Sequence, residues 1–474
     1  MRKEVKPKSM KTRLFLLVLW WIQTSFPLLA QEVPKSQEVI RDTNTLRHFL
    51  KTGKFYGHAR SYWSATLNQN RLTDYYAWAV GGGIGYQTLK LAKRFQLGVS
   101  GFFIFNLASS DLARPDPATS MVNRYEIGLF DIERPNYHRD LGRLEEFYLK
   151  AHFGKKSILT LGRQVPESPF INPQDGRMSP TLTEGAVLDV NEWPHLKLRS
   201  QYLWRISPRS TMRWLEIDES MGMYPVGVGL DGRPSQYKGQ TESDFIAIFG
   251  ATYKKSKWEI QLWDTYVDNV LNTFFVKAEW RSLAKGGTNW MTGAQLTIQN
   301  ITGNGGNPNA LLAYAQPGSA VVTSGRIGQE SERFDWYLNA THIWSQQRYL
   351  MPREWGKEPF YTFMPRERND GFGNLTAATV NTRFKPQKDI ELTLSGGYFH
   401  LPDVKNFRQN KYGMPGYSQI NLGLTYQFDQ YLKGLSAFLL VVRKDKIGSV
   451  YDDSRYIFNK VNMVHANLIL NYRF

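Results

Sequence analysis

The sequence predicts an all-β protein: a transmembrane up-and-down antiparallel β-barrel of about 18 strands with an inward-folded constriction loop. Three observations lead to this prediction. After its first thirty residues the 474-residue chain has no long apolar run, and its mean hydropathy is −0.44. Segments of about 10 residues alternate apolar and polar side chains, as the strands of a membrane barrel do. Short polar turns then alternate with longer connections along the chain.

The composition excludes several classes of protein. The 14 Trp, 25 Tyr and 27 Phe, with 42% hydrophobic residues, are too many for a disordered chain. The absence of cysteine excludes a disulfide scaffold, a thiol enzyme, a Cys₄ zinc site and an iron–sulfur protein. The 59 Lys+Arg against 42 Asp+Glu give a charge of +17, which by itself would favour a nucleic-acid partner.

Residues 1–30 are expected to be a signal peptide, cleaved near Ala30. A basic segment precedes the apolar run Leu14–Ile22, and the segment closes on a small residue before polar sequence. Nine residues are too few for a membrane anchor, which takes about 20. Without this segment the charge falls to +12. An exported protein meets little nucleic acid, so we expect no nucleic-acid partner. Export together with the predicted barrel indicates a location in the bacterial outer membrane, in contact with its lipids.

The alternation is clearest at the C-terminus. One face of the last segment carries Val464, Ala466, Leu468, Leu470, Tyr472 and Phe474. An earlier segment repeats the pattern with Ile420, Leu422, Leu424, Tyr426 and Phe428. A large soluble sandwich or propeller would alternate as well. Two features favour the membrane barrel: aromatic residues begin or end the apolar faces, and there is no blade-like repeat.

The whole region 55–474 is expected to be one barrel domain, preceded by a periplasmic arm, 31–54. Expected strands are 55–67, 75–88, 94–107, 143–154, 157–165, 183–192, 195–206, 243–254, 257–268, 270–282, 289–301, 333–345, 374–385, 388–401, 417–428, 434–446 and 460–474. Strands 289–301 and 333–345 both run outward, so an inward strand is needed within 302–332, near 310–322. That makes eighteen, and an even number is usual for a bacterial barrel.

No motif for chemistry stands out. There is no nucleophile elbow, P-loop or dinucleotide fingerprint, and the eight His have no metal-ligand spacing. We therefore expect no catalytic residue, no metal and no cofactor. The distinctive segment is 158–190, which leaves a strand and bends through Pro166, Pro169 and Pro173. Three prolines stiffen this loop, which suits a loop folded into a pore.

The motifs resemble the OprD family of substrate-specific outer-membrane porins. They are Ala59-Arg-Ser-Tyr62, Ala77-Trp-Ala-Val80, the strand end Gly162-Arg-Gln164, and the loop core Asp175-Gly-Arg177-Met-Ser-Pro180. The usual Phe-Arg-Gly after the loop reads Leu182-Thr-Glu184-Gly185, so a carboxylate replaces a basic residue. The resemblance implies an 18-stranded monomeric barrel narrowed by inward loops. It also implies a ladder of basic wall residues facing acidic loop groups.

Candidate constriction residues combine this implication with strand parity. Arg60, Lys150, Lys197, Arg199 and Arg383 lie on polar strand faces, where a ring of cations attracts and orients anions. Asp175 and Arg177 would meet them from the loop.

The function that the resemblance implies, and that these basic residues favour, is passive, substrate-selective diffusion of small anionic or zwitterionic solutes, such as amino acids or small carboxylates. Two alternatives remain open. One is a larger-solute channel for oligosaccharide uptake or polysaccharide export, with Tyr148 and Glu184 as sugar contacts. The other is a barrel enzyme or adhesin.

Overall fold

The computed structural model of the chain describes residues 51–69, 71–135, 141–173, 177–282, 287–344, 347–429 and 432–474. The chain divides into two compact units, 1–42 and 43–474, and the second contains everything that follows. The predicted signal peptide and most of the predicted arm lie outside the described residues. Within them, no helix is long and apolar enough to cross a membrane.

The second unit is one closed antiparallel barrel. Its strands are β1 (Lys54–Asn68), β2 (Tyr75–Gln87), β3 (Phe95–Ser109), β4 (Leu141–Phe153), β5 (Ser157–Gln164), β6 (Leu182–Val190), β7 (Leu196–Ser207), β9 (Ile246–Lys255), β10 (Trp258–Val267), β11 (Leu271–Arg281), β12 (Thr288–Ile301), β13 (Ser319–Ser331), β14 (Phe334–Ile343), β15 (Thr376–Gln387), β16 (Ile390–His400), β17 (Tyr417–Gln427), β18 (Leu435–Lys446) and β19 (Met463–Arg473). Each pairs with its neighbours, and β1 pairs with both β2 and β19. The predicted 18-stranded barrel is confirmed.

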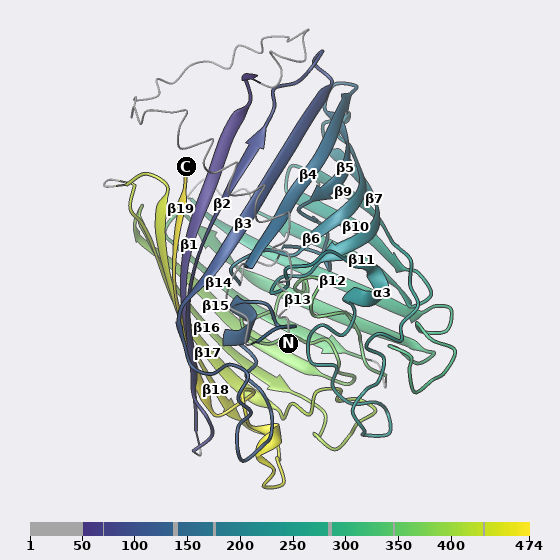
Figure 1. Cartoon of the computed structure of the whole chain (residues 1–474), viewed down its shortest axis with the longest axis vertical. Helices are drawn as coiled ribbons and strands as arrows, with labels where there is room; N and C mark the ends of the chain where they lie inside the picture. The colour runs from purple at the N-terminus through teal and green to yellow at the C-terminus, as the bar shows by residue number, and fades with distance from the viewer. Residues whose placement is uncertain are drawn as a thin grey trace, which may run out of the picture. The chain divides into compact units, whose positions relative to one another are not determined.

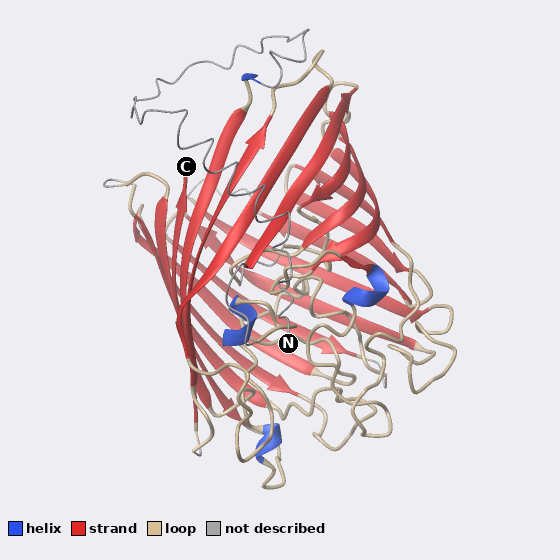
Figure 2. Ribbon diagram, viewed as in Figure 1, coloured by secondary structure: helices blue, strands red, loops and turns tan. Residues whose placement is uncertain are grey.

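The remaining elements belong to connections. The two-residue strand β8 (Leu215–Glu216) pairs with β7 and leads into helix α3 (Ile217–Ser220). Two 3₁₀ turns, η1 (Glu126–Leu129) and η2 (Ser454–Tyr456), lie in other loops. Figure 2 shows these short helices among the tan loops, with every long strand in the wall.

Outward and inward side chains of the wall follow the predicted alternation. Leu468 and Leu470 of β19 are 42% and 39% exposed on the outside, while His465 and Asn467, on the opposite face of the strand, are at most 1% exposed. In β17, Ile420 and Leu422 are 56% and 53% exposed, and Gln419 and Asn421 are buried. The barrel therefore carries its apolar faces outward and polar faces inward, the reverse of a soluble core.

The prediction of a strand near 310–322 was wrong in position. The strand is β13, Ser319–Ser331, within the expected 302–332 but starting nine residues later. Its sequence, Ser-Ala-Val-Val-Thr-Ser-Gly-Arg-Ile-Gly-Gln-Glu-Ser, has small residues where other strands have large apolar ones, so its period is weak. The apolar residues of 310–315 instead belong to a loop, where Tyr314 is buried.

The two ends of the barrel differ in the length of their connections. The short-turn end carries connections such as 154–156, 256–257 and 388–389. The other end carries nine loops, which we name L1 (69–74), L2 (110–140), L3 (165–181), L4 (208–245), L5 (268–270), L6 (302–318), L7 (344–375), L8 (401–416) and L9 (447–462). Figure 1 shows the short turns at the top and the long loops crowded at the lower end and inside the ring of strands.

Strand β5, which leads into L3, contains a glycine whose backbone conformation other residues rarely adopt. Gly162 in β5 has φ +113°, and a Cβ there would lie 2.3 Å from the carbonyl oxygen of Phe147 in β4. We expect Gly162→Ala to destabilise the barrel by about 1–3 kcal/mol, because the side chain forces either the backbone or the β4–β5 pairing to shift. Urea unfolding of the protein in lipid vesicles measures the change.

The control for this variant is Gly396→Ala in β16. Gly396 has no atom within 4 Å of its Cβ position and no positive φ. The control should unfold at the wild-type urea concentration, and a Gly162 variant as stable as the control would contradict the assignment.

Candidate functional site

The inward face of β1 holds two of the long loops by side-chain contacts. Arg60 donates from Nη1 to the carbonyl oxygen of Arg177 in L3, 2.5 Å away, and from Nε to Oδ1 of Asn471, 2.7 Å away. Two residues further on, the Tyr62 hydroxyl accepts a hydrogen bond of 3.1 Å from Nη2 of Arg366 in L7. L3 and L7 therefore meet the wall at neighbouring positions of one strand.

The next two inward residues of β1 hold L2. Ser64 and Thr66 donate to Oε1 of Glu126 over 3.1 and 2.7 Å. Glu126 is fully buried in η1, and its other oxygen accepts from Asn123 over 2.7 Å. His465 of β19 lies 3.5 Å from the same carboxylate. From Arg60 to Thr66, every second residue of β1 thus binds an inward loop.

The two predicted residues Arg60 and Arg177 are brought together by these contacts, and a second arginine helps to hold L3. Arg143 of β4 donates to the carbonyl oxygen of Pro180 over 2.6 Å and to the hydroxyl of Ser207 over 2.9 Å. Wall arginines therefore fix the loop through its backbone at both Arg177 and Pro180. The predicted Asp175, two positions before Arg177 in the sequence, lies outside the described residues.

Lys150, Lys197 and Arg199 lie on the inward faces of β4 and β7. The Lys150 ammonium sits 4.4 Å from the centre of the Tyr148 ring, and Lys197 is exposed near the short-turn end. Arg199 donates to Asp189 over 2.6 Å and to the Glu167 carboxylate of L3 over 2.5 Å. Of these three residues, Arg199 thus contacts L3, through Glu167.

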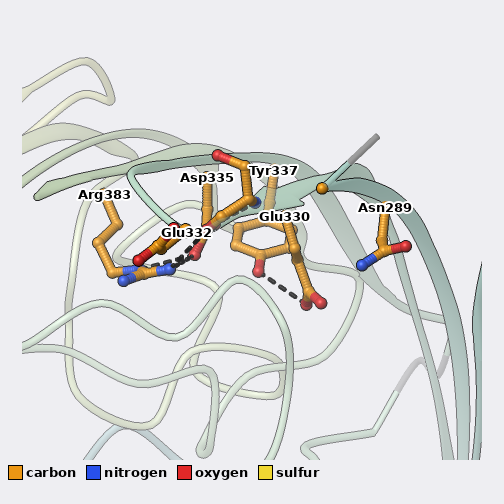
Figure 3. Close-up of a pocket in the computed structure, with 8 residues that line it drawn as sticks. Asn289, Glu330, Glu332, Asp335, Tyr337 and Arg383 are labelled. Atoms are coloured by element: carbon orange, nitrogen blue, oxygen red, sulfur yellow. Dashed lines mark hydrogen bonds and ion pairs between the residues drawn. The ribbon is translucent and has the colours of Figure 1, made fainter. Parts of the chain in front are cut away.

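Arg383 lies at the short-turn end of β15, in a different place from the contacts of L3 and L7. It pairs with Asp335 of β14, and Glu391 of β16 lies 3.9 Å away. Figure 3 shows Arg383 pointing to Asp335 beside Glu330 and Tyr337, in a cavity of about 400 Å³. Tyr337 donates to Glu330 over 2.9 Å. This cavity is a mouth of the barrel lined by both signs of charge.

The sequence analysis missed L7, which packs against several other loops. Trp355 is fully buried and donates to Ser220 over 2.8 Å, and its carbonyl oxygen accepts from the backbone of Asn172 in L3. The Glu354 carboxylate accepts from the backbone amide of Gly222 in L4 over 2.6 Å. The signal was available: L7 holds a dense run of Pro and aromatic residues between 352 and 365, which is too apolar for a solvated loop.

A buried group of charges ties L7 to L2 and the wall. The Glu367 carboxylate lies 2.9 Å from Arg124, 3.3 Å from Arg353 and 3.2 Å from Lys444 of β18. Burial alone would raise the pKa of Glu367, but these three cations hold it well below its usual range. Arg353 also pairs with Asp370 over 2.9 Å. Because several hydrogen-bonded partners share the desolvation cost, the loops keep this cluster ionised.

Among the residues described, no group of three or more His, Cys, Asp or Glu side chains could hold a metal ion. The pairs described above are ion pairs and hydrogen bonds that hold loops.

Glu358 of L7 makes the packing of this loop sensitive to alkaline pH. Burial and the charge of Asp370 raise the pKa of Glu358 to about 8, and its carboxyl group lies 3.0 and 2.9 Å from the amide of Asn369. A raised pKa in the folded state means that protonated Glu358 favours packing. That stability is complete below the unfolded pKa, near 4.3, and is lost as the pH rises through about 8.

We expect amide hydrogen exchange in 352–370 to be faster in the wild type than in Glu358→Gln above pH 8, and equal in both at pH 4, below the unfolded pKa. Comparison at matched pH cancels the intrinsic pH dependence of exchange. Glu242→Gln, at an exposed acid of L4, is the control and should follow the wild type. Equal exchange in wild type and Glu358→Gln at pH 9 would refute the assignment.

Comparisons with known proteins agree with this architecture. Residues 138–309 match the sequence model of the family described as outer membrane porin, OprD family. No curated protein matches the chain. The structure of Pseudomonas aeruginosa OpdK with vanillate is similar at TM-score 0.69 and 15% identity, covering 90% of this chain and 99% of that one.

Two other solved structures are equally similar. Pseudomonas aeruginosa OccK9 (OpdG) aligns at TM-score 0.70 and 15% identity, over 90% of this chain and 99% of that one. Acinetobacter baumannii OccAB3 aligns at TM-score 0.70 and 15% identity, over 89% and 99%. At such identities these likenesses show the fold, while the family match covers β4 to L6. Residues 138–309 thus match the family of OprD outer membrane porins in sequence, and the described barrel has the fold of these solved structures.

Proposed function

We propose that this porin passes small carboxylates and zwitterions by passive diffusion, past a constriction where L3 and L7 meet β1. The single observation that carries the proposal is the gathering of arginines at that place. Arg60 of β1 binds the backbone of Arg177 in L3, and Arg366 of L7 donates to Tyr62, two residues beyond Arg60 on the same strand. Guanidinium groups bind carboxylates in a bidentate, oriented way.

The electrostatic influence of Arg177 reaches a neighbouring loop. Burial, together with the charges of Arg368 and Arg177, lowers the pKa of Arg209 in L4. In a narrow water-filled space with low-dielectric walls, such a group of charges raises the local concentration of anions.

Asp175 would add the opposite charge and admit zwitterions such as amino acids. It stays a proposal, as do Lys150, Lys197 and Arg199 as further steps of the basic ladder. Arg383 would contribute at the periplasmic mouth, since short turns face the periplasm in bacterial barrels. The vanillate bound to OpdK is an aromatic carboxylate, which agrees in chemical class with the proposed solutes. The proposal includes that the protein acts as a monomer.

The oligosaccharide alternative depends on free sugar-binding faces, and its two candidate residues are engaged. The Tyr148 ring is 6% exposed and lies under Lys150. Glu184 accepts from Arg163 over 2.7 Å and from Trp204 over 3.1 Å. The carboxylate that replaces the family's basic residue is therefore used in an ion pair of the wall.

Ion selectivity tests the position of the constriction. We expect Arg60→Gln to lower the anion-to-cation permeability ratio by about fivefold, the equivalent of ~1 kcal/mol of charge interaction. Arg383→Gln should change it less, because Asp335 already balances that charge at the mouth. Reversal potentials across planar bilayers under a salt gradient give the ratio. An equal or larger effect of Arg383→Gln would place the selective step elsewhere.

Liposome swelling tests the solute class. Proteoliposomes should swell faster in benzoate or glutamate than in a neutral trisaccharide, and Arg60→Gln should slow the carboxylates more than glycerol. Glycerol flux reports the open area of the pore and is the internal control. Faster swelling with the trisaccharide would favour the oligosaccharide channel instead.

A further inference from the structure

Basic residues are concentrated on one half of the periplasmic rim. Six exposed lysines, which we call the basic rim, lie on the turns β2–β3, β4–β5 and β9–β10: Lys90, Lys93, Lys155, Lys156, Lys255 and Lys257. These turns belong to the continuous arc of wall from β1 to β10, purple to teal in Figure 1. The long loops at the other end carry acids and bases in similar numbers.

The other half of the same rim is balanced. Three of its four turns hold one base and one acid, namely Arg333 with Glu332, Lys388 with Asp389, and Lys433 with Asp429. On the basic half, Glu192 is engaged with the β4–β5 turn. Its carboxylate accepts from the amides of Lys155 and Lys156 and from Ser157, at 2.5 to 3.2 Å. It therefore shapes the turn that presents two of the lysines.

Exposed aromatic residues adjoin these lysines on the outside of the barrel. Phe95, Phe153 and Trp258 are 43%, 45% and 50% exposed. Lys255 pairs across the strands with Trp258 and lies two residues from Tyr253, which is 39% exposed, so all three share the lipid face. Aromatic girdles mark the edge of the apolar layer of the membrane. A residue one to three positions from the girdle, toward the periplasm, lies about 3–10 Å outside that layer, at the level of the lipid headgroups.

We propose that the basic rim binds anionic phospholipid headgroups of the inner leaflet of the outer membrane. A phosphate-bearing headgroup fits because the lysines lie beside the lipid-facing aromatics. Lysine near an anionic membrane surface attracts it, and the attraction acts within a Debye length. A soluble acidic partner fits less well, since turns of two to seven residues do not extend beyond the membrane surface. This contact fixes the orientation of the barrel in the membrane. It also enriches anionic lipids along one half of the circumference of the barrel.

The test compares spin-labelled phosphatidylglycerol and phosphatidylcholine in phosphatidylcholine vesicles that contain the full-length porin. The electron spin resonance spectrum gives the fraction of each lipid immobilised by the protein. We expect a preference of about fivefold for phosphatidylglycerol at low salt, falling toward one in 0.5 M salt. The triple variant Lys155→Gln/Lys156→Gln/Lys255→Gln should lose most of it.

A matched control removes the same charge from the opposite half: Arg333→Gln/Lys388→Gln/Lys433→Gln should keep the wild-type preference. Lys155→Arg/Lys156→Arg/Lys255→Arg should also keep it, and this variant tests the proposal even where the Gln triple fails to fold. Equal immobilisation of both lipids by the wild type would overturn the proposal, as would equal losses in the two Gln triples. Binding of soluble polyglutamate without lipid preference would overturn it in favour of a soluble acidic partner.

Discussion

The pore of this barrel depends on the attachment of three loops to one face of one strand. Successive inward residues of β1, from Arg60 to Thr66, contact L3, L7 and L2 in turn. Successive inward side chains of a strand are about 6–7 Å apart. Loops that are far apart in the sequence therefore attach to β1 at neighbouring points and lie side by side in the lumen. Because β1 also pairs with β19, closure of the barrel and placement of the loops depend on the same strand.

The loops stay inside the barrel because they bring a core of their own. Trp355 and its neighbours supply buried apolar area, and Glu367 joins L7 to Arg124 of L2 and Lys444 of the wall. Breaking a buried ion pair by removing one partner costs about 3–5 kcal/mol, since the other charge is left unpaired. Such a cluster gives the loops one arrangement, which a selective channel needs more than a general pore does.

Arginine has two roles in this lumen. Arg60 and Arg143 donate to carbonyl oxygens of L3 and so position the loop, while their positive charge remains in the pore region. A lysine would supply the charge without the planar fork that reaches two acceptors at once. Basic residues thus gather in two places of the barrel, at the loops of the lumen and at the short turns.

The sequence by itself determined the wall of this protein, and the tertiary structure decided its interior. Period-2 alternation is a local property, so strands such as β17 and β19, and the inward direction of Arg60 or Arg383, followed from residue order. The Gly- and Ser-rich β13 was misplaced because Thr323, Gly325 and Gln329 interrupt the apolar residues of its outward face. L7 has no period, and its packing with L3 and L4 is set by contacts across the lumen between residues more than a hundred positions apart. For the same reason parity could not separate Arg60, which meets the loops, from Arg383, which meets Asp335 at the mouth: the depth of a residue in the pore depends on where the loops fold.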